Sequence, residues 1–194
     1  MLPTGTLREY VSGAKRANII IVTKTPKIFS PITRRRLIEE VKPKEHQKIF
    51  FSYLKFDDLV PLHEGVTVEV KDRYFSILML TGIANPYPLK DHLKGLCSEV
   101  ESLTYPDHHI YTESDLLKIK KTYDNLFTQN KIIVTTEKDA MRLIDNSSLS
   151  IIKDLPIYYI PIEIEFHEED KNEFDKLIST YVRENKSNSG VYKK

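Results

Sequence analysis

The strongest constraint on the fold is a regular alternation of short apolar segments with amphipathic ones from Asn18 onward. The apolar segments have the length of strands and mostly lack polar alternation, which predicts strands covered on both faces. They are residues 18–23, 48–54, 74–80, 131–136 and 157–162, with a weaker strand at 100–104. Because parallel neighbours need crossover connections, this order predicts an α/β fold with a mostly parallel sheet covered by helices. We expect the strands at 19–22 and 132–134 to lie in one sheet.

Helices are predicted between these strands from apolar stripes and start signals. Ser30 and Pro31 suit the start of a helix that ends before Pro43. Apolar residues at helical spacing predict further helices at 89–97, 113–130, 138–144 and 168–184. Residues 57–71 are predicted to be a loop or a small antiparallel excursion. The expected organisation is a linker with a short helix at 1–17, an α/β domain at 18–184 and a disordered, polar tail at 185–194.

Composition excludes several classes of protein. The formal net charge of the 194 residues is +1, so no global field favours a nucleic-acid partner. A single cysteine, Cys97, rules out an intramolecular disulfide framework. The apolar runs are far shorter than the roughly 20 residues of a membrane span, and the first residues lack the pattern of a signal peptide. The chain has six glycines and contains neither GxxxxGK[ST] nor GxGxxG, so it lacks the phosphate-binding loops of ATP-using enzymes.

The densest polar cluster is Tyr105-Pro106-Asp107-His108-His109, which follows the weak strand. Ligands of open parallel sheets bind beyond the carboxyl ends of the strands, so this loop is well placed for chemistry. A histidine there could orient a carboxylate or shuttle a proton. A solvated turn with a capping aspartate is the alternative. A metal site is a weaker possibility, because no third ligand lies at a suitable spacing.

Two similar turns follow other predicted strands. Small residues in the 81–86 segment (TGIANP) would let a backbone or ligand approach closely, unless this is an ordinary strand-to-helix turn. Charges in the 135–140 segment (TTEKDA) could bind a polar ligand or cap a helix. Near the start, Arg8 could hold a phosphate and Glu9 could accept from a ribose or adenine, or both could be an exposed pair. The run 34–36 (RRR) could face anionic lipid or substrate phosphate, or simply solvent.

Taken in order, these motifs resemble a single family. The succession LPTGTLRE, NIIIVTK, LTGIANP, YPDHH, IIVTTEKDA and IYYIPIEIEF is similar to the carboxyl-terminal half of tetraacyldisaccharide 4'-kinase, the lipid A 4'-kinase. The resemblance covers about residues 2 to 166. It implies a kinase that uses Mg-ATP to phosphorylate the 4'-hydroxyl of a tetraacyldisaccharide 1-phosphate precursor of lipid A. It also implies a location at the cytoplasmic face of the inner membrane of Gram-negative bacteria.

The resemblance further implies a division of labour between two domains. In the family, an amino-terminal domain carries the P-loop, the magnesium ligands and a catalytic aspartate, and a Rossmann-like carboxyl-terminal domain forms a lid. The match implies that His108 supports that aspartate and that Arg8 and Glu9 lie beside the nucleotide. It leaves open the roles of Asn85, Glu137, Lys138 and Asp139.

Because this sequence lacks the P-loop segment, we expect it to be the lid part of a longer kinase and to be inactive alone. Its partners would be the lipid A disaccharide precursor, the P-loop domain and, through the parent enzyme, the membrane surface. Two other readings remain: a small-molecule-binding α/β domain, or a structural domain without a ligand. The structural reading would gain if the loops containing His108 and Arg8 lay on unrelated surfaces.

Overall fold

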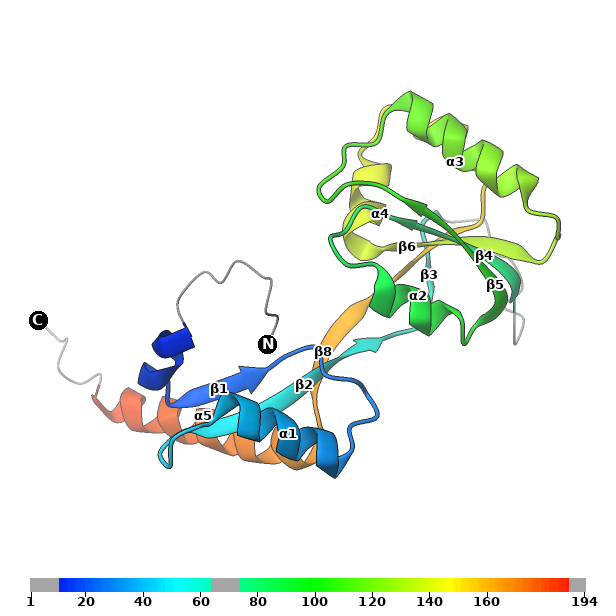
Figure 1. Cartoon of the computed structure of the whole chain (residues 1–194). Coiled ribbons are helices and arrows are strands. Elements are labelled where there is room, and N and C mark those ends of the chain that lie inside the picture. The colour runs from blue at the N-terminus through cyan, green and yellow to red at the C-terminus, as the bar shows by residue number, and fades with distance from the viewer. Residues whose placement is uncertain (1–10, 64–73, 189–194) are drawn as a thin grey trace, which may run out of the picture. The chain divides into compact units, whose positions relative to one another are not determined.

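The computed structural model describes residues 11–63 and 74–188 (Figure 1). These residues form two compact units. The first unit combines the residues up to Lys55 with those from Glu163 onward, and the second unit covers Phe56–Ile162. The chain therefore passes between the units twice, within strand β2 (Lys48–Phe56) and at the start of strand β8 (Ile162–Phe166).

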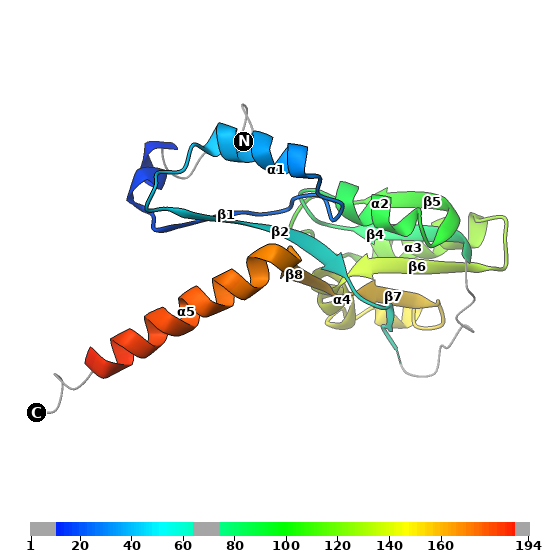
Figure 2. The same ribbon diagram turned by 90° about the horizontal axis from the view of Figure 1, so that it is seen from below.

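In the first unit, the described residues form a sheet with the strand order β1-β2-β8. Strand β1 (Ile19–Val22) runs parallel to β2, and a short 3-10 helix, η1 (Val11–Arg16), precedes it. Helices α1 (Pro31–Val41) and α5 (Glu168–Asn188) lie on opposite sides of β1 and β2, as Figure 2 shows.

Neighbouring residues of β2 contact the two helices of the first unit. The Phe50 ring packs against Phe174 of α5 at a centroid distance of 5.3 Å. The next residue, Phe51, lies on the other face, where the Arg34 guanidinium of α1 is 4.6 Å from its ring centroid. Because successive side chains of a strand point to opposite faces, this central strand is covered on both sides.

The second unit holds a larger sheet, for which the described residues give the order β3-β7-β6-β4-β5. The pairs β4–β5, β4–β6 and β6–β7 are parallel, and the short β3 is antiparallel to β7. The strands of this sheet are β3 (Val60–Pro61), β4 (Tyr74–Thr81), β5 (Cys97–Thr104), β6 (Lys131–Thr136) and β7 (Ile157–Ile160). The helical elements are α2 (Tyr87–Leu93), α3 (Glu113–Asn125), α4 (Glu137–Ile144) and the 3-10 helix η2 (Leu149–Ile151).

Both faces of this sheet carry a buried core. On one face, Leu78 of β4 packs in a cluster with Leu116 of α3 and Leu143 of α4. On the other face, Ile77 and Met79 of β4 join a cluster with residues of α2. Figure 1 shows α3 and α2 on opposite sides of the sheet. The predicted fold class, α/β with mostly parallel strands covered by helices, is therefore confirmed.

The prediction of one continuous sheet is wrong, because β1 lies in the first unit's sheet and β6 in the second. Residues 18–184, expected as one domain, divide between the two units. Alternation of strands and helices identifies crossover units, but it does not say which strands become neighbours. The segment 157–162 also divides, since β7 ends before Pro161 and β8 begins after it.

Several element boundaries also differ from the predictions. Helix α2 ends at Leu93, and Cys97 begins β5 instead of continuing the helix. Helix α3 ends at Asn125, five residues before the predicted end. Helix α5 continues to Asn188, into the segment predicted as a tail, whose remainder lies outside the described residues. The antiparallel excursion predicted in 57–71 is confirmed at β3, and its residues from 64 onward also lie outside the described ranges.

Candidate functional site

The three polar loops singled out in the sequence meet at one edge of the second unit's sheet. The 81–86 segment follows β4, the 105–109 segment follows β5, and the 135–140 segment joins β6 to α4. These strands are neighbours in the order β6-β4-β5, and all run in the same direction. Their carboxyl ends therefore lie side by side, at the edge where open parallel sheets place ligands.

Asp139 ties two of these loops together. Its carboxylate is fully buried, and Oδ2 accepts hydrogen bonds from the Gly82 backbone N–H (2.9 Å) and from Thr136 Oγ1 (2.8 Å). The other oxygen, Oδ1, accepts from Arg142 Nη1 at 3.2 Å. Buried carboxylates are tolerated when they are paired and hydrogen-bonded in this way. The capping alternative for this segment is also realised, since Thr136 Oγ1 accepts from the Asp139 N–H at the start of α4.

The close approach of the loops explains the small residue in the 81–86 segment. A Cβ atom at Gly82 would lie 3.1 Å from Asp139 Oδ1 and 3.3 Å from the Pro106 carbonyl oxygen. Any side chain there would have to push apart the loops after β5 and β6. The absence of a side chain at Gly82 therefore allows these loops to pack closely.

His108 lies on the exposed side of this cluster. Its backbone is left-handed, with φ of 64°, and its N–H donates to Asp107 Oδ1 at 3.0 Å. The imidazole Nδ1 is 3.2 Å from Arg142 Nη2, and Nε2 is 3.5 Å from Lys138 Nζ and 3.6 Å from Asp107 Oδ2. With 73% of the side chain accessible, the ring can meet a group from outside the unit.

Asp107 balances the positive charge beside the ring. Lys138 Nζ donates to Asp107 Oδ1 at 3.3 Å. Desolvation alone would raise the pKa of Asp107, but the hydrogen bond and charge of Lys138 and the hydrogen bond from the His108 backbone N–H lower this pKa below its usual value. The carboxylate therefore stays ionised to a lower pH than an isolated aspartate. The site therefore presents the imidazole of His108 beside two cations, each paired with a carboxylate: Lys138 with Asp107, and Arg142 with Asp139.

His109 points to different partners and supports the loop. Its Nε2 lies 2.9 Å from Asp115 Oδ2, and its ring stacks on Tyr105 at a centroid distance of 4.5 Å. Asp115 also accepts from the Thr112 N–H and hydroxyl at the start of α3. Within the described residues, no group of three or more His, Cys, Asp or Glu side chains could hold a metal ion.

The Asp115 contacts lead to a prediction about pH and stability. Desolvation raises the pKa of Asp115, but the hydrogen bonds from Thr112 and His109 outweigh it, so the pKa of the folded state is lowered. This contribution to stability is present above the unfolded pKa of about 3.9 and is lost as pH falls through the folded-state pKa. Asp115→Asn should cost about 1 kcal/mol at neutral pH and much less in acid, as measured by urea unfolding followed by circular dichroism. An equal cost at both pH values would contradict the assignment.

Other predicted residues fall outside this cluster. Arg8 and Glu9 lie outside the described residues. Asn85 Oδ1 accepts from the Tyr87 N–H at the start of α2, which is a local role. Glu137 is the exposed first residue of α4. Arg142 was not singled out in the sequence. Its position three residues after Asp139 would have indicated an ion pair between the two side chains on one helix face.

The arginine run on α1 divides between core and surface. Arg34 makes a bidentate pair with the buried carboxylate of Asp170, which also accepts from the Phe51 N–H at 2.7 Å. Arg34 is therefore a structural residue rather than a lipid-facing one. Arg35 and Arg36 are exposed, which agrees both with the lipid- or phosphate-facing reading and with the solvent alternative.

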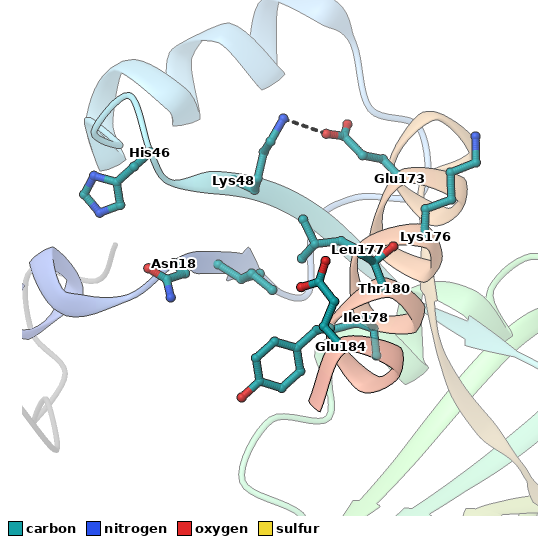
Figure 3. Close-up of a pocket in the computed structure, with 11 residues that line it drawn as sticks. Asn18, His46, Lys48, Glu173, Lys176, Leu177, Ile178, Thr180 and Glu184 are labelled. Atoms are coloured by element: carbon teal, nitrogen blue, oxygen red, sulfur yellow. Dashed lines mark hydrogen bonds and ion pairs between the residues drawn. The ribbon is translucent and has the colours of Figure 1, made fainter. Parts of the chain in front are cut away.

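The first unit also has a groove of about 860 Å³ between β1, β2 and α5, drawn in Figure 3. Its apolar wall includes Ile19, Leu177 and Ile178. At its rim, Lys48 Nζ pairs with Glu173 Oε1 at 2.9 Å, marked by the dashed line in Figure 3. None of the predicted site residues within the described ranges lines this groove. In those same ranges, no helix is both long and apolar enough to cross a membrane.

Comparison with known proteins identifies the family. Residues 1–183 match the family model described as tetraacyldisaccharide-1-P 4'-kinase. The chain belongs to this family. The resemblance inferred from the motifs is thereby confirmed, and the convergent loops described above are parts of a tetraacyldisaccharide-1-P 4'-kinase family chain.

Individual relatives agree with this assignment. The tetraacyldisaccharide 4'-kinase of Bacteroides thetaiotaomicron is 37% identical over 199 residues, which cover 97% of this chain and 52% of the relative. The tetraacyldisaccharide 4'-kinase of Flavobacterium johnsoniae is 39% identical over 187 residues, which cover 95% of this chain and 51% of that relative. The chain thus spans about half the length of the curated relatives it matches. A crystal structure of LpxK from Aquifex aeolicus in complex with ATP is 20% identical, with a TM-score of 0.47, and covers 93% of this chain and 47% of that one.

Proposed function

We propose that this chain works as the carboxyl-terminal part of a kinase that transfers the γ-phosphate of ATP to the 4'-hydroxyl of a tetraacyldisaccharide 1-phosphate. The family match along residues 1–183 supports the reaction. The observation that carries the proposal is the convergence of three loops around His108 at the carboxyl edge of β4, β5 and β6. A purely structural domain would have no need for an exposed imidazole held between two cations at this edge.

The chain's own residues do not fit the main requirements of Mg-ATP. The sequence has no P-loop, and the described residues supply no group of three ligands for a metal. Lys138 and Arg142 are already paired with Asp107 and Asp139. The metal site and phosphate cradle therefore belong to a separate P-loop domain in this proposal, as does the catalytic aspartate.

His108 then contributes by contacting a group outside this unit. Its exposed ring would donate a hydrogen bond to the carboxylate that accepts the proton of the 4'-hydroxyl, which orients that carboxylate and favours its ionised form. Phosphoryl transfer depends mainly on positioning and charge stabilisation. A lid that carries His108 and excludes water can supply part of both.

The substrate indicates where the reaction takes place. A disaccharide with four acyl chains is strongly amphiphilic and stays in a membrane, because burial of each methylene is worth about 0.8 kcal/mol. We therefore place the parent enzyme at the cytoplasmic face of the bacterial inner membrane, where it has access to ATP. The membrane surface, the lipid precursor and the P-loop domain are its proposed partners.

Arg8 and Glu9 are the proposed nucleotide contacts of this chain. The guanidinium of Arg8 offers paired donors to phosphate, and Glu9 accepts from ribose or adenine. In the full-length enzyme, Arg8→Ala should raise the KM for ATP, and Arg8→Lys should not fully restore it, because an ammonium cannot form the paired bonds. An ATP KM and kcat equal to those of the parent enzyme in both variants would make this segment a connector only.

The test of the proposed function compares the 194-residue chain with the full-length protein. With Mg-ATP and the tetraacyldisaccharide 1-phosphate in mixed micelles, thin-layer chromatography of the labelled product measures transfer. We expect phosphorylation of the 4'-hydroxyl by the full-length protein and none by the chain alone. Turnover by the chain alone would overturn the division of roles, and no turnover by the full-length protein would overturn the reaction.

A further inference from the structure

The contacts of Arg142 connect the buried part of the site to its exposed part. Nη1 donates to Asp139 Oδ1 at 3.2 Å, and Nη2 lies 3.2 Å from His108 Nδ1. A guanidinium is a donor only, so His108 Nδ1 must be the acceptor and therefore carries no proton. The neutral ring then holds its proton on Nε2. We propose that Arg142 is a positioning residue that fixes the tautomer and direction of the His108 ring, an inference that rests on the proposed function of His108.

Arg142 is itself rigidly held. Asp139, its partner, is fully buried and bonded to the Gly82 N–H and Thr136 Oγ1, so the carboxylate cannot follow the arginine outward. The Arg142 side chain is mostly buried, with 23% accessible. A continuous set of contacts therefore runs from the loop after β4, through Asp139 and Arg142, to the imidazole.

His108 needs this support because packing does not provide it. Most of its side chain is exposed, and its backbone is in the left-handed region, which is unfavourable for a non-glycine residue. An exposed ring on such a loop would otherwise rotate freely. The bond to Arg142 Nη2 is the contact that restricts Nδ1 among the described residues.

The opposite ring nitrogen faces outward with its proton. The Lys138 ammonium is also a donor only and lies 3.5 Å from Nε2, but a neutral imidazole accepts at one nitrogen, and the shorter contact, 3.2 Å at Nδ1, is the one that we take as that bond. Asp107 Oδ2 is 3.6 Å from Nε2, which is too long for a well-formed hydrogen bond. The Nε2–H therefore remains able to donate to an incoming carboxylate. By accepting at Nδ1 from Arg142, the His108 ring presents a donor, Nε2–H, and not an acceptor to the incoming carboxylate.

Nuclear magnetic resonance of the 194-residue chain tests this directly. Long-range ¹⁵N–¹H spectra report which imidazole nitrogen is protonated, and His108→Gln assigns the signal. At about pH 8.5, where imidazoles of model peptides are neutral, we expect a single Nε2–H tautomer of His108 in the unsubstituted 194-residue chain. We expect a mixture of tautomers in Arg142→Met and in Arg142→Lys. The lysine variant keeps a cation beside Asp139, and it remains informative if the methionine variant does not fold.

A matched control and a kinetic measurement complete the test. Arg183→Met, on exposed α5, should leave the His108 signal unchanged. In the full-length kinase, Arg142→Lys should lower kcat about 10-fold with little change in KM. Combined with His108→Ala, it should add no further loss, since both changes remove the same contact.

The outcomes separate the inference from the proposed function. A single Nε2–H tautomer in Arg142→Lys, or losses that multiply in the double variant, would overturn the positioning role. A tautomer mixture in Arg142→Lys together with full activity of His108→Ala would support the positioning role and overturn the function proposed for His108.

Discussion

Alanine in place of His108 is expected to lower the kcat of the full-length kinase by about 10²-fold with little change in the KM for either substrate. The ring does not belong to the phosphate cradle in this proposal, so substrate binding is retained. In the proposed mechanism, the loss arises because the catalytic carboxylate of the P-loop domain would no longer receive the Nε2–H bond that orients it. Steady-state kinetics with the tetraacyldisaccharide 1-phosphate and Mg-ATP measure both constants.

The backbone at His108 requires a second variant. With φ of 64°, this position favours glycine, so His108→Gly relieves strain while it removes the same ring. Both variants should lose the same activity, although the glycine variant should be the more stable. His109→Ala is the neighbouring control, and it should reduce stability more than kcat because His109 bonds within the chain to Asp115. An unchanged kcat in both His108 variants would remove this residue from the reaction.

Asp139→Ala is expected to have the largest effect on stability, a loss of about 3 kcal/mol in the second unit. The substitution leaves the Arg142 guanidinium mostly buried without its carboxylate, and the Gly82 N–H and Thr136 hydroxyl lose their acceptor. Removing one partner of a buried pair costs far more than an exposed substitution. Urea unfolding of the 194-residue chain, followed by tyrosine fluorescence, measures the change.

Two further variants define this effect. Asp154→Ala, at an exposed position of the same unit, should change stability by less than about 0.5 kcal/mol. Asp139→Asn keeps one acceptor oxygen for the Gly82 N–H but loses the charge that pairs with Arg142. Its loss of stability should therefore lie between those of Asp154→Ala and Asp139→Ala. A loss in Asp139→Ala no greater than in the control would show that the loops do not depend on this carboxylate.

Local features of the fold were predictable, and long-range ones were not. Ser30 and Pro31 define the start of α1 through the cap and the fixed proline φ, and both are visible in the sequence. Cys97 was placed in a helix because it falls four residues after Leu93 at helical spacing. Gly95, between them, is the signal that the helix ends. The assignment of β1 and β6 to different sheets depends on pairing between distant segments, on which alternation carries no information.

The site shows the same limit. Each polar loop could be found because it follows a predicted strand. Their meeting depends on the order β6-β4-β5, which the sequence does not reveal. Arg142 was missed because its partner His108 lies 34 residues earlier in the chain, and nothing near Arg142 indicates that contact. Gly82 was recognised as a place of close approach, but its neighbour Asp139 came only from the structure.

The outer position of β1 affects how this chain can be handled in solution. Among the described residues β2 is the strand that pairs with it, so the opposite edge of Ile19–Val22, four consecutive uncharged β-branched residues, has no strand partner within that part of the chain. Such an edge is a template for strand addition by another molecule. Self-association of the 194-residue chain would then rise with protein concentration and fall in a variant with a charge at Ile21, which is exposed. Spectra and binding curves of the chain are therefore best compared at matched, low concentrations.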